Sequence, residues 1–407
     1  MGEFIPVNTP LINGSEKDYL QKCIETGWIS SEGPFVEQFE QKFAKLVGRK
    51  HAIAVTNGSA ALEIAAHALG IKKGDEVILP TFTIISCIAP LIRIGAIPVL
   101  IDADPLTWNM DVNQIEERIN SRTRAIMAVH IYGLPVDMDP LLSLAKRHGL
   151  MVIEDAAEAQ GLYYKDRACG SLGDISTFSF YPNKLITTGE GGMVVTDNDA
   201  IAEKCRSLRN LCFQPRKRFI HEELGWNFRM SNIQAALGLA QIERLDEFIK
   251  KKRNMGRRYT ALLKGLKNIQ LPLAKTHYAE NIYWVYGLVL DDNLSDDAEI
   301  FMKKLKKFGF GSRTYLPLGN EMDGRIRDVK RWSKTSKHYI SIGQELSITN
   351  IQLAIGDALA VACLNKKKFN KYDFSRLHPS GNLGSQLKTV EDLMVTGSKI
   401  PFISENK

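Results

Sequence analysis

Residues 151–161 read MVIEDAAEAQG, and this stretch gives the first indication of the fold. An apolar run ends in Glu154 and Asp155 beside small residues, a pattern typical of a buried strand at its carboxyl end. In α/β sheets, groups at this end of a strand face the ligand crevice. We therefore expect Asp155 to lie in a functional site, although an acid in this position is also a common helix cap.

Further β-rich runs alternate with helical patterns from about residue 50 to 200, which predicts a mostly parallel sheet covered by helices. The seven expected strands are His51–Val55, Glu76–Leu79, Ile97–Ile101, Ala125–Val129, Met151–Glu154, Ile175–Phe180 and Met193–Val195. Helical spacing of apolar residues marks 60–69 and 140–148. From Ser231 to Leu263 a longer amphipathic pattern predicts a helix pair or one kinked helix that leaves the large domain.

The expected architecture is a large α/β domain over residues 1–245 followed by a smaller α+β domain over 246–318, which is expected to be incomplete. In the small domain, strand signals at 283–290 and 310–316 flank a helix at 298–308. The segment 1–35 has the alternative of packing outside the large domain. Residues 319–407 are expected to form an atypical tail.

The composition excludes several function classes. The 407 residues carry a net charge of +7, with basic residues spread among acidic ones, so nucleic-acid binding is not indicated. No apolar run approaches membrane-spanning length, and the first residues do not resemble a signal peptide, so we expect a cytoplasmic protein with no membrane partner. The six cysteines are far apart, which predicts reduced thiols and no structural metal.

Residues 178–192 read FSFYPNKLITTGEGG, and Lys184 is their most informative residue. A lysine amine near a carboxylate that can hold a pyridine nitrogen indicates a Schiff base with pyridoxal 5′-phosphate. Asp155 is the candidate carboxylate. The alternative for Lys184 alone is a solvated loop lysine.

Two further segments fit such a cofactor. A strand, a tight turn and a helix start at Asn57-Gly58-Ser59-Ala60, and the amides of a helix N-terminus with the Ser59 hydroxyl make an anion site suited to a phosphate. The alternative is an ordinary serine N-cap. Phe82 follows a strand end, where its ring either stacks on a flat cofactor or belongs to the core.

Together these pieces resemble one enzyme family. Residues 1 to about 318 resemble the sugar aminotransferases of the DegT/DnrJ/EryC1/StrS family and, within it, the GDP-perosamine synthases, which implies the pyridoxal phosphate aminotransferase type I fold. Besides the Lys184 run, the segments that carry the resemblance are 28–31, 57–62, 107–111, 130–133, 154–159 and 227–232.

The resemblance implies a role for each site residue. Lys184 forms the Schiff base and moves the proton, and Asp155 pairs with the ring nitrogen. Ser59, the Ala60 amide and Ser179 hold the phosphate, Phe82 stacks on the ring, and Glu158 lies near the ring hydroxyl. Further implied contacts are Gly58 beside the phosphate, Asn227 from the other subunit of a homodimer, and Trp28, Ser31, Arg313 and Tyr315 near the sugar nucleotide.

The implied reaction transfers an amino group from glutamate to C4 of a nucleotide-linked 4-keto-6-deoxy sugar. GDP-4-keto-6-deoxymannose is the expected substrate, GDP-perosamine the product, and surface polysaccharide, such as lipopolysaccharide O-antigen, the destination. A related group of sugar dehydrases carries histidine in place of the lysine, so Lys184 disfavours dehydration.

The resemblance stops after Leu318. Residues 347–403 resemble instead the end of an arabinose-5-phosphate isomerase sugar-binding domain, a fragment too short to build a sheet domain of its own. Two alternatives therefore remain: an aminotransferase homologue that binds its cofactor without turnover, and a sugar phosphate isomerase.

Overall fold

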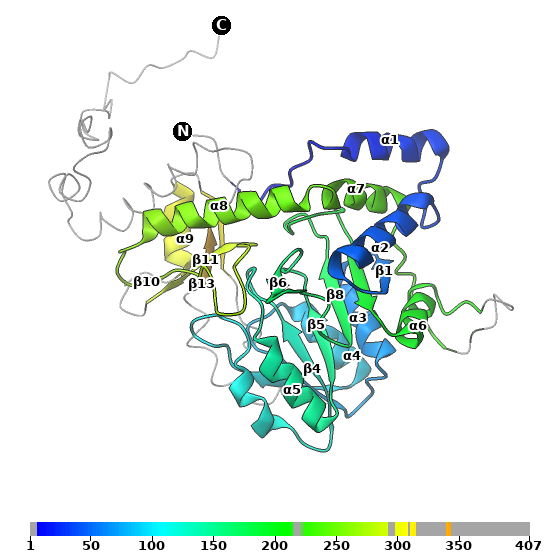
Figure 1. Cartoon of the computed structure of the whole chain (residues 1–407), viewed down its shortest axis with the longest axis horizontal. Helices are drawn as coiled ribbons and strands as arrows, with labels where there is room; N and C mark the ends of the chain where they lie inside the picture. The colour runs from blue at the N-terminus through cyan, green and yellow to red at the C-terminus, as the bar shows by residue number, and fades with distance from the viewer. Residues whose placement is uncertain are drawn as a thin grey trace, which may run out of the picture.

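The structure is a computed structural model, and it describes residues 6–214, 221, 223–291, 298–307, 310–314 and 339–342. Its main body is a seven-stranded sheet with helices on both faces (Figure 1). The strands are β1 (His51–Val55), β2 (Glu76–Pro80), β3 (Ile97–Ile101), β4 (Thr123–Val129), β5 (Met151–Asp155), β8 (Ile175–Ser179) and β9 (Gly192–Thr196). All seven strands expected from the sequence are present; β1 and β3 have the expected bounds, and the ends of the others are shifted by one or two residues.

The strand order is β1-β9-β8-β5-β4-β2-β3. Strands β8, β5, β4, β2 and β3 pair in parallel, whereas β9 is antiparallel to both of its neighbours. The predicted mostly parallel α/β fold is therefore confirmed. Because β1 runs in the same direction as the parallel strands, the carboxyl ends of β1, β2, β4, β5 and β8 share one edge of the sheet.

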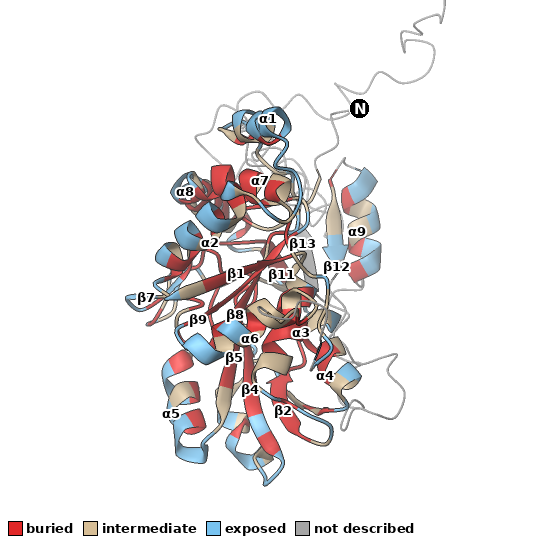
Figure 2. Ribbon diagram, turned by 90° about the vertical axis from the view of Figure 1, so that its right-hand side faces the viewer, coloured by how far each residue is buried: buried red, intermediate tan, exposed pale blue. Residues whose placement is uncertain are grey.

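Alternate side chains of each strand enter two separate cores, as the twofold period of a strand requires. In β1, Ala52 and Ala54 belong to one core, and Ile53 and Val55 to the other. The first core is covered by α2 (Pro34–Val47), α5 (Met138–His148) and α7 (Asn232–Ile242). The second is covered by α3 (Gly58–Ala68), α4 (Ala89–Ile94) and α6 (Asp199–Arg209), so the domain has three layers (Figure 2).

The N-terminal segment lies against α7. Helix α1 (Glu16–Thr26) packs on α7, and the Asn232 side chain donates to the Trp28 carbonyl at 2.7 Å. The Gln241 side chain donates to the Leu11 carbonyl at 3.0 Å. This segment is thus attached to the large domain through the last helix of that domain.

The small domain follows the long helix α8 (Leu245–Leu263), which together with α7 forms the predicted helix pair. It contains α9 (Ala298–Lys307) and a four-stranded sheet in the order β10-β11-β13-β12, with its own core. Its strands are β10 (Ile269–Gln270), β11 (Tyr286–Leu290), β12 (Ser312–Thr314) and β13 (Tyr339–Ile342). Strand β13 lies in the segment that the sequence analysis assigned to the tail, and it pairs with both β11 and β12.

Short elements complete the description. They are the 3₁₀ turns η1 (Ile85–Cys87), η2 (Val112–Gln114) and η3 (Glu116–Arg118) and the two-stranded ribbon of β6 (Tyr163–Tyr164) and β7 (Arg167–Ala168). Within the described residues, none of the helices has the length and hydrophobicity that a membrane crossing requires. The isomerase-like fragment 347–403 lies outside the described residues.

Candidate active site

A cavity of about 450 Å³ opens at the carboxyl edge of the large sheet. Its walls come from the segments that follow β1, β2, β4, β5 and β8, and the small domain adds Trp284 and Arg313. Of the residues predicted for the site, those that line the cavity are Gly58, Ser59, Phe82, Asp155, Glu158, Ser179, Lys184 and Arg313. One cavity therefore brings together residues that are up to 255 positions apart in the sequence, from Gly58 to Arg313.

Lys184 lies on the loop after β8, with its side chain largely buried. Its Nζ atom is 3.5 Å from Glu158 Oε1 and 3.9 Å from the centre of the Trp284 ring. A cation over an indole face at this distance is stabilised by the ring quadrupole. The amine is therefore held between a carboxylate of the large domain and an aromatic ring that the small domain supplies.

The loop that carries Lys184 is fixed on both sides. The buried Gln160 side chain donates to the Ser179 carbonyl before the lysine and accepts from the Ile186 amide after it at 3.0 Å. The Trp284 indole N–H donates to the carbonyl of Asn183 at 2.7 Å. These bonds restrict the lysine backbone, so the reach of the amine is set before any ligand enters.

Asp155 is the last residue of β5 and is 3% exposed. Its Oδ1 atom accepts from the Ala157 amide at 3.0 Å, and its Oδ2 atom accepts from the Cys87 thiol at 3.1 Å. The carboxylate caps a turn by its bond to Ala157, and it also lines the cavity. Asp155 therefore acts both as a cap and as a residue of the cavity wall, the two alternatives that its sequence pattern left open.

Glu158 faces the cavity from the turn after β5. Its Oε2 atom accepts from the Tyr132 amide at 2.9 Å, and its Oε1 atom faces Lys184. Burial raises the pKa of the Glu158 carboxyl, against the opposing effect of the Lys184 charge. A carboxyl in this balance holds a proton near the amine more readily than an exposed glutamate does.

The N-terminus of α3 forms the polar end of the cavity, at Gly58 and Ser59. Gly58 lies so close to Ser179 that an added Cβ would be 2.7 Å from the Ser179 Cβ. The expected role of the Ala60 amide needs correction, because this N–H donates to the Asn57 side chain at 2.8 Å. Asn57 is the helix N-cap, so Ala60 does not line the cavity and its amide is already occupied.

Phe82 lines the cavity and is 5% exposed. It meets the Tyr132 ring edge to face, with 5.6 Å between the ring centres. Tyr132 in turn lies 6.2 Å from Trp284. The aromatic wall therefore includes three rings, of which the sequence analysis identified one.

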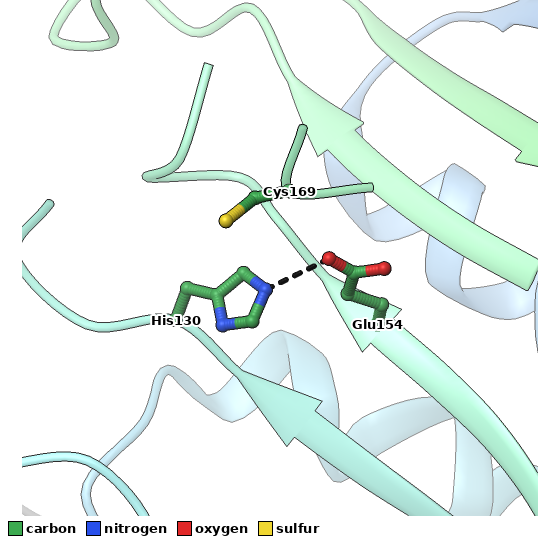
Figure 3. A group of neighbouring side chains, drawn as sticks. All are labelled: His130, Glu154 and Cys169. Atoms are coloured by element: carbon green, nitrogen blue, oxygen red, sulfur yellow. Dashed lines mark hydrogen bonds and ion pairs between the residues drawn. The ribbon is translucent and has the colours of Figure 1, made fainter. Parts of the chain in front are cut away.

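A buried polar cluster supports the end of β5 from behind. Glu154 accepts a hydrogen bond from His130 Nε2 at 2.9 Å, and Cys169 lies beside the pair (Figure 3). The Glu154 carboxylate also accepts from three backbone amides in the segment 170–173 and from the Ser176 hydroxyl. Burial would raise the pKa of Glu154, but the His130 bond and the amide donors lower it to about 2. His130 Nδ1 accepts from the Val136 amide at 3.2 Å, so both ring nitrogens serve hydrogen bonds. The cluster also meets the backbone of Asp155, because the His130 amide donates to the Asp155 carbonyl at 3.1 Å.

Four predicted residues lie away from this cavity or outside the described part. Asn227 is exposed and pairs with Asn210 on another loop. Trp28 is 49% exposed, and the Ser31 hydroxyl accepts from Arg229 Nε at 3.1 Å. Tyr315 lies outside the described residues. The roles of these four residues remain predictions.

The structure also places at the site side chains that the sequence analysis missed: Trp284 and Tyr132 line the cavity, and Cys87 contacts Asp155. Trp284 stands in an aromatic run, Tyr283-Trp284-Val285-Tyr286, but its interpretation as part of a strand gave it no site role. Two buried polar atoms beside the cavity, Thr177 Oγ1 and Asn183 Oδ1, have no hydrogen-bond partner among the described residues. Together with the amine and Asp155, they fit a polar aromatic cofactor with several hydrogen-bonding groups.

A lysine amine and a strand-end carboxylate on one cavity of a three-layer α/β domain are the arrangement of aminotransferases that use pyridoxal 5′-phosphate. The model of the DegT/DnrJ/EryC1/StrS aminotransferase family matches residues 10–331, and the chain belongs to this family. The resemblance seen in the sequence is thereby confirmed. Confirmed with it are the predicted class, a pyridoxal 5′-phosphate-dependent sugar aminotransferase, and its cofactor.

Three relatives illustrate the match. The chain is 46% identical to a GDP-perosamine synthase of Caulobacter vibrioides over 312 residues, which cover 76% of this chain and 83% of that protein. A GDP-perosamine synthase of Vibrio cholerae is 41% identical over 77% of this chain and 84% of its own length. The crystal structure of DesV from S. venezuelae superposes with a TM-score of 0.81 at 29% identity, covering 89% of this chain and 99% of DesV.

Proposed function

We propose that this chain transfers an amino group from glutamate to C4 of GDP-4-keto-6-deoxymannose and so makes GDP-perosamine. The identity of 41–46% to GDP-perosamine synthases over most of the chain supports this substrate. The structural observation that carries the proposal is Lys184, whose amine reaches the same cavity as Asp155.

Pyridoxal 5′-phosphate, when bound, supplies an aldehyde carbon that exchanges amino groups and a ring that withdraws electrons. Asp155 holds a proton at the ring nitrogen, which keeps the ring electron-poor. Ser59, Ser179 and the N-terminus of α3 would bind the phosphate, without the Ala60 amide, which Asn57 occupies. These residues would hold the cofactor in the cavity that Lys184 also lines.

Lys184 holds and moves the proton at Nζ. Its two anchors in this structure, Glu158 and the Trp284 ring, keep the free amine beside the cavity whenever it is not covalently engaged. The amine therefore stays within reach for proton transfer in both halves of the reaction. Arg313, exposed at the small-domain side of the cavity, places a positive charge where a diphosphate would enter.

The central experiment incubates the purified chain with GDP-4-keto-6-deoxymannose, glutamate and pyridoxal 5′-phosphate. Mass spectrometry then follows replacement of the ketone by an amine, with the TDP and UDP analogues as comparisons. We expect conversion of the GDP sugar in preference to the other two. Conversion of only a TDP or UDP sugar would reject the proposed substrate and leave the enzyme class intact.

Lys184→Ala tests the assignment of the lysine. Borohydride reduction should attach the cofactor to the natural chain at Lys184 and should attach none to the variant, and turnover of the variant should be abolished because no other side chain replaces this amine. Turnover retained by Lys184→Ala would contradict the mechanism. A cofactor complex that glutamate does not bleach would favour the inactive homologue, and conversion of ribulose 5-phosphate would favour the isomerase.

The quaternary arrangement is part of the same proposal: a cytoplasmic homodimer in which Asn227 completes the neighbouring subunit's site, serving surface polysaccharide such as lipopolysaccharide O-antigen. The exposure of Asn227 outside its own cavity supports this arrangement. Mixing Lys184→Ala with Asn227→Ala protein should restore activity, because one site of each mixed dimer combines an intact Lys184 with an intact Asn227. Absence of recovery, with mixed dimers seen by sedimentation, would reject the contribution of Asn227.

A further inference from the structure

The carboxylate of Asp155 has a partner on the side that faces away from the cavity. Cys87, the last residue of η1, is 0% exposed and donates its thiol hydrogen to Asp155 Oδ2 at 3.1 Å. Cys87 does not line the cavity, whereas Asp155 does. We propose that Cys87 is a positioning residue that holds the Asp155 carboxylate for the cofactor's ring nitrogen, an inference that rests on the proposed function.

The direction of the hydrogen bonds is fixed by the groups present. An ionised carboxylate only accepts, so the thiol donates to Asp155. The sulfur is also 3.0 Å from the hydroxyl of Thr83, which then donates to it. Thr83 lines the cavity. A continuous chain of two hydrogen bonds therefore runs from the cavity wall through the sulfur to the carboxylate.

Burial and the adjacent Asp155 charge both raise the pKa of the Cys87 thiol well above its usual range. The sulfur thus keeps its hydrogen across the pH range in which enzymes of this class work. A thiolate in the same place would repel the carboxylate. Protonation of the thiol is what makes Cys87 a donor and not a competing anion.

The two donors divide the carboxylate between them. Ala157 N–H binds Oδ1, and Cys87 S–H binds Oδ2, so each oxygen has one hydrogen-bond partner among the described residues. Each carboxylate oxygen has about two acceptor directions, which leaves one on each oxygen for a ligand. Without Cys87, the Ala157 bond alone, of those in the described part of the chain, would restrain the carboxylate, and rotation about its last torsion would be freer.

The alternative is that Cys87 only fills space in the core. Cys87 belongs to the core that includes α3, and a buried cysteine often acts as a small apolar side chain. Cys205 on α6 provides a matched control, because it lies in the same core, is 0% exposed and has no hydrogen-bond partner for its thiol among the described residues. Cys87→Ala and Cys205→Ala remove the same atoms, but only the first removes a bond to Asp155.

The first experiment uses the infrared S–H stretch of the protein without cofactor. The spectrum of the natural chain minus that of Cys87→Ala isolates the Cys87 band, and the corresponding difference with Cys205→Ala isolates the control band. We expect the Cys87 band at lower frequency than the Cys205 band and expect Asp155→Ala to raise it. Equal frequencies, or no response to Asp155→Ala, would overturn the proposal whether or not the chain is an aminotransferase.

The second experiment measures the dissociation constant of pyridoxal 5′-phosphate and the pH dependence of the bound cofactor's absorption. Cys87→Ala should raise the dissociation constant about three- to tenfold, the effect of losing one hydrogen bond, and should shift the pH profile of the absorption. Cys87→Ser retains a donor and should restore the dissociation constant and the pH profile. Cys205→Ala should match the natural chain. Equal losses in Cys87→Ala and Cys205→Ala, or no rescue by serine, would refute the positioning role, whereas failure of every form to aminate a sugar would reject only the proposed function.

Discussion

Replacing Glu154 by glutamine should destabilise the large domain substantially. The carboxylate accepts from His130 at 2.9 Å, Leu172 at 2.9 Å, Gly173 at 3.1 Å and Ser176 at 3.2 Å, and it also accepts from the Gly170 amide. An amide offers one accepting oxygen, so some of these buried donors would face an NH₂ group. Leaving a buried donor without its acceptor in this way costs about 1–3 kcal/mol.

The lowered pKa of Glu154 gives a second estimate of how much its carboxylate stabilises the fold. A value of about 2 in the folded chain, against 4.5 for an ordinary glutamate, corresponds to about 3 kcal/mol. Because the folded pKa is the lower one, this stabilisation is present above pH 4.5 and is lost as the pH falls toward 2. The stability difference between the natural chain and Glu154→Gln should therefore shrink as the solution is acidified below about pH 5.

The assay is urea unfolding of the cofactor-free protein followed by circular dichroism, since a bound ligand would shift the apparent stability. Glu203→Gln on α6 is the control, because Glu203 is exposed on its helix. A Glu154→Gln midpoint equal to that of Glu203→Gln would refute the argument. So would a stability difference that does not depend on pH.

Three other substitutions give further tests, two of them at the site and one at a buried lysine of α8. Gly58→Ala places a methyl group 2.7 Å from the Cβ of Ser179 and should raise the dissociation constant of pyridoxal 5′-phosphate about tenfold or more. An unchanged dissociation constant would contradict the tight fit. Lys252 is buried, and burial lowers its pKa from 10.5 to about 7. Between about pH 7 and pH 10.5 the unfolded chain therefore binds more protons than the folded chain, so the stability of the natural chain should rise with pH in this range. Lys252→Met lacks this pH dependence. The melting temperature of the variant should exceed that of the natural chain most below about pH 7, and the difference should shrink toward about pH 10. A difference that stays constant with pH would refute the role of Lys252 titration. Gln160→Ala releases both ends of the lysine loop and should lower kcat more than it changes KM, whereas an effect on KM alone would assign Gln160 to substrate binding.

Much of the large domain was accessible from the sequence because its strands are short apolar runs with clear ends. The position of Asp155 at the end of β5 and of Lys184 after β8 followed from the same pattern. The antiparallel placement of β9 did not, because strand direction depends on connections and not on periodicity. The pairing of β13 was missed for a similar reason, since a four-residue strand far along the chain gives a weak local signal.

The errors in the site have physical causes as well. The resemblance implied a phosphate contact for the Ala60 amide, whereas Asn57, three residues before Ala60, caps the helix and accepts the hydrogen bond of that amide. Trp284 reaches Asn183 across 101 residues of sequence because the small domain folds back on the large one. No local pattern encodes a contact of that kind, and the Cys87 bond to Asp155 is equally non-local.

The pairing of β12 has a consequence for the cavity. Among the described strands, β12 forms hydrogen bonds with β13 alone, and it carries Arg313 to the cavity mouth. A chain ending at residue 338 would deprive β12 of that neighbour and release the guanidinium from its place, although every group beside Lys184 would still be encoded. The place of Arg313 at the cavity thus depends on the backbone of residues 339–342, and under the proposed function a late segment of the polypeptide would contribute to substrate capture.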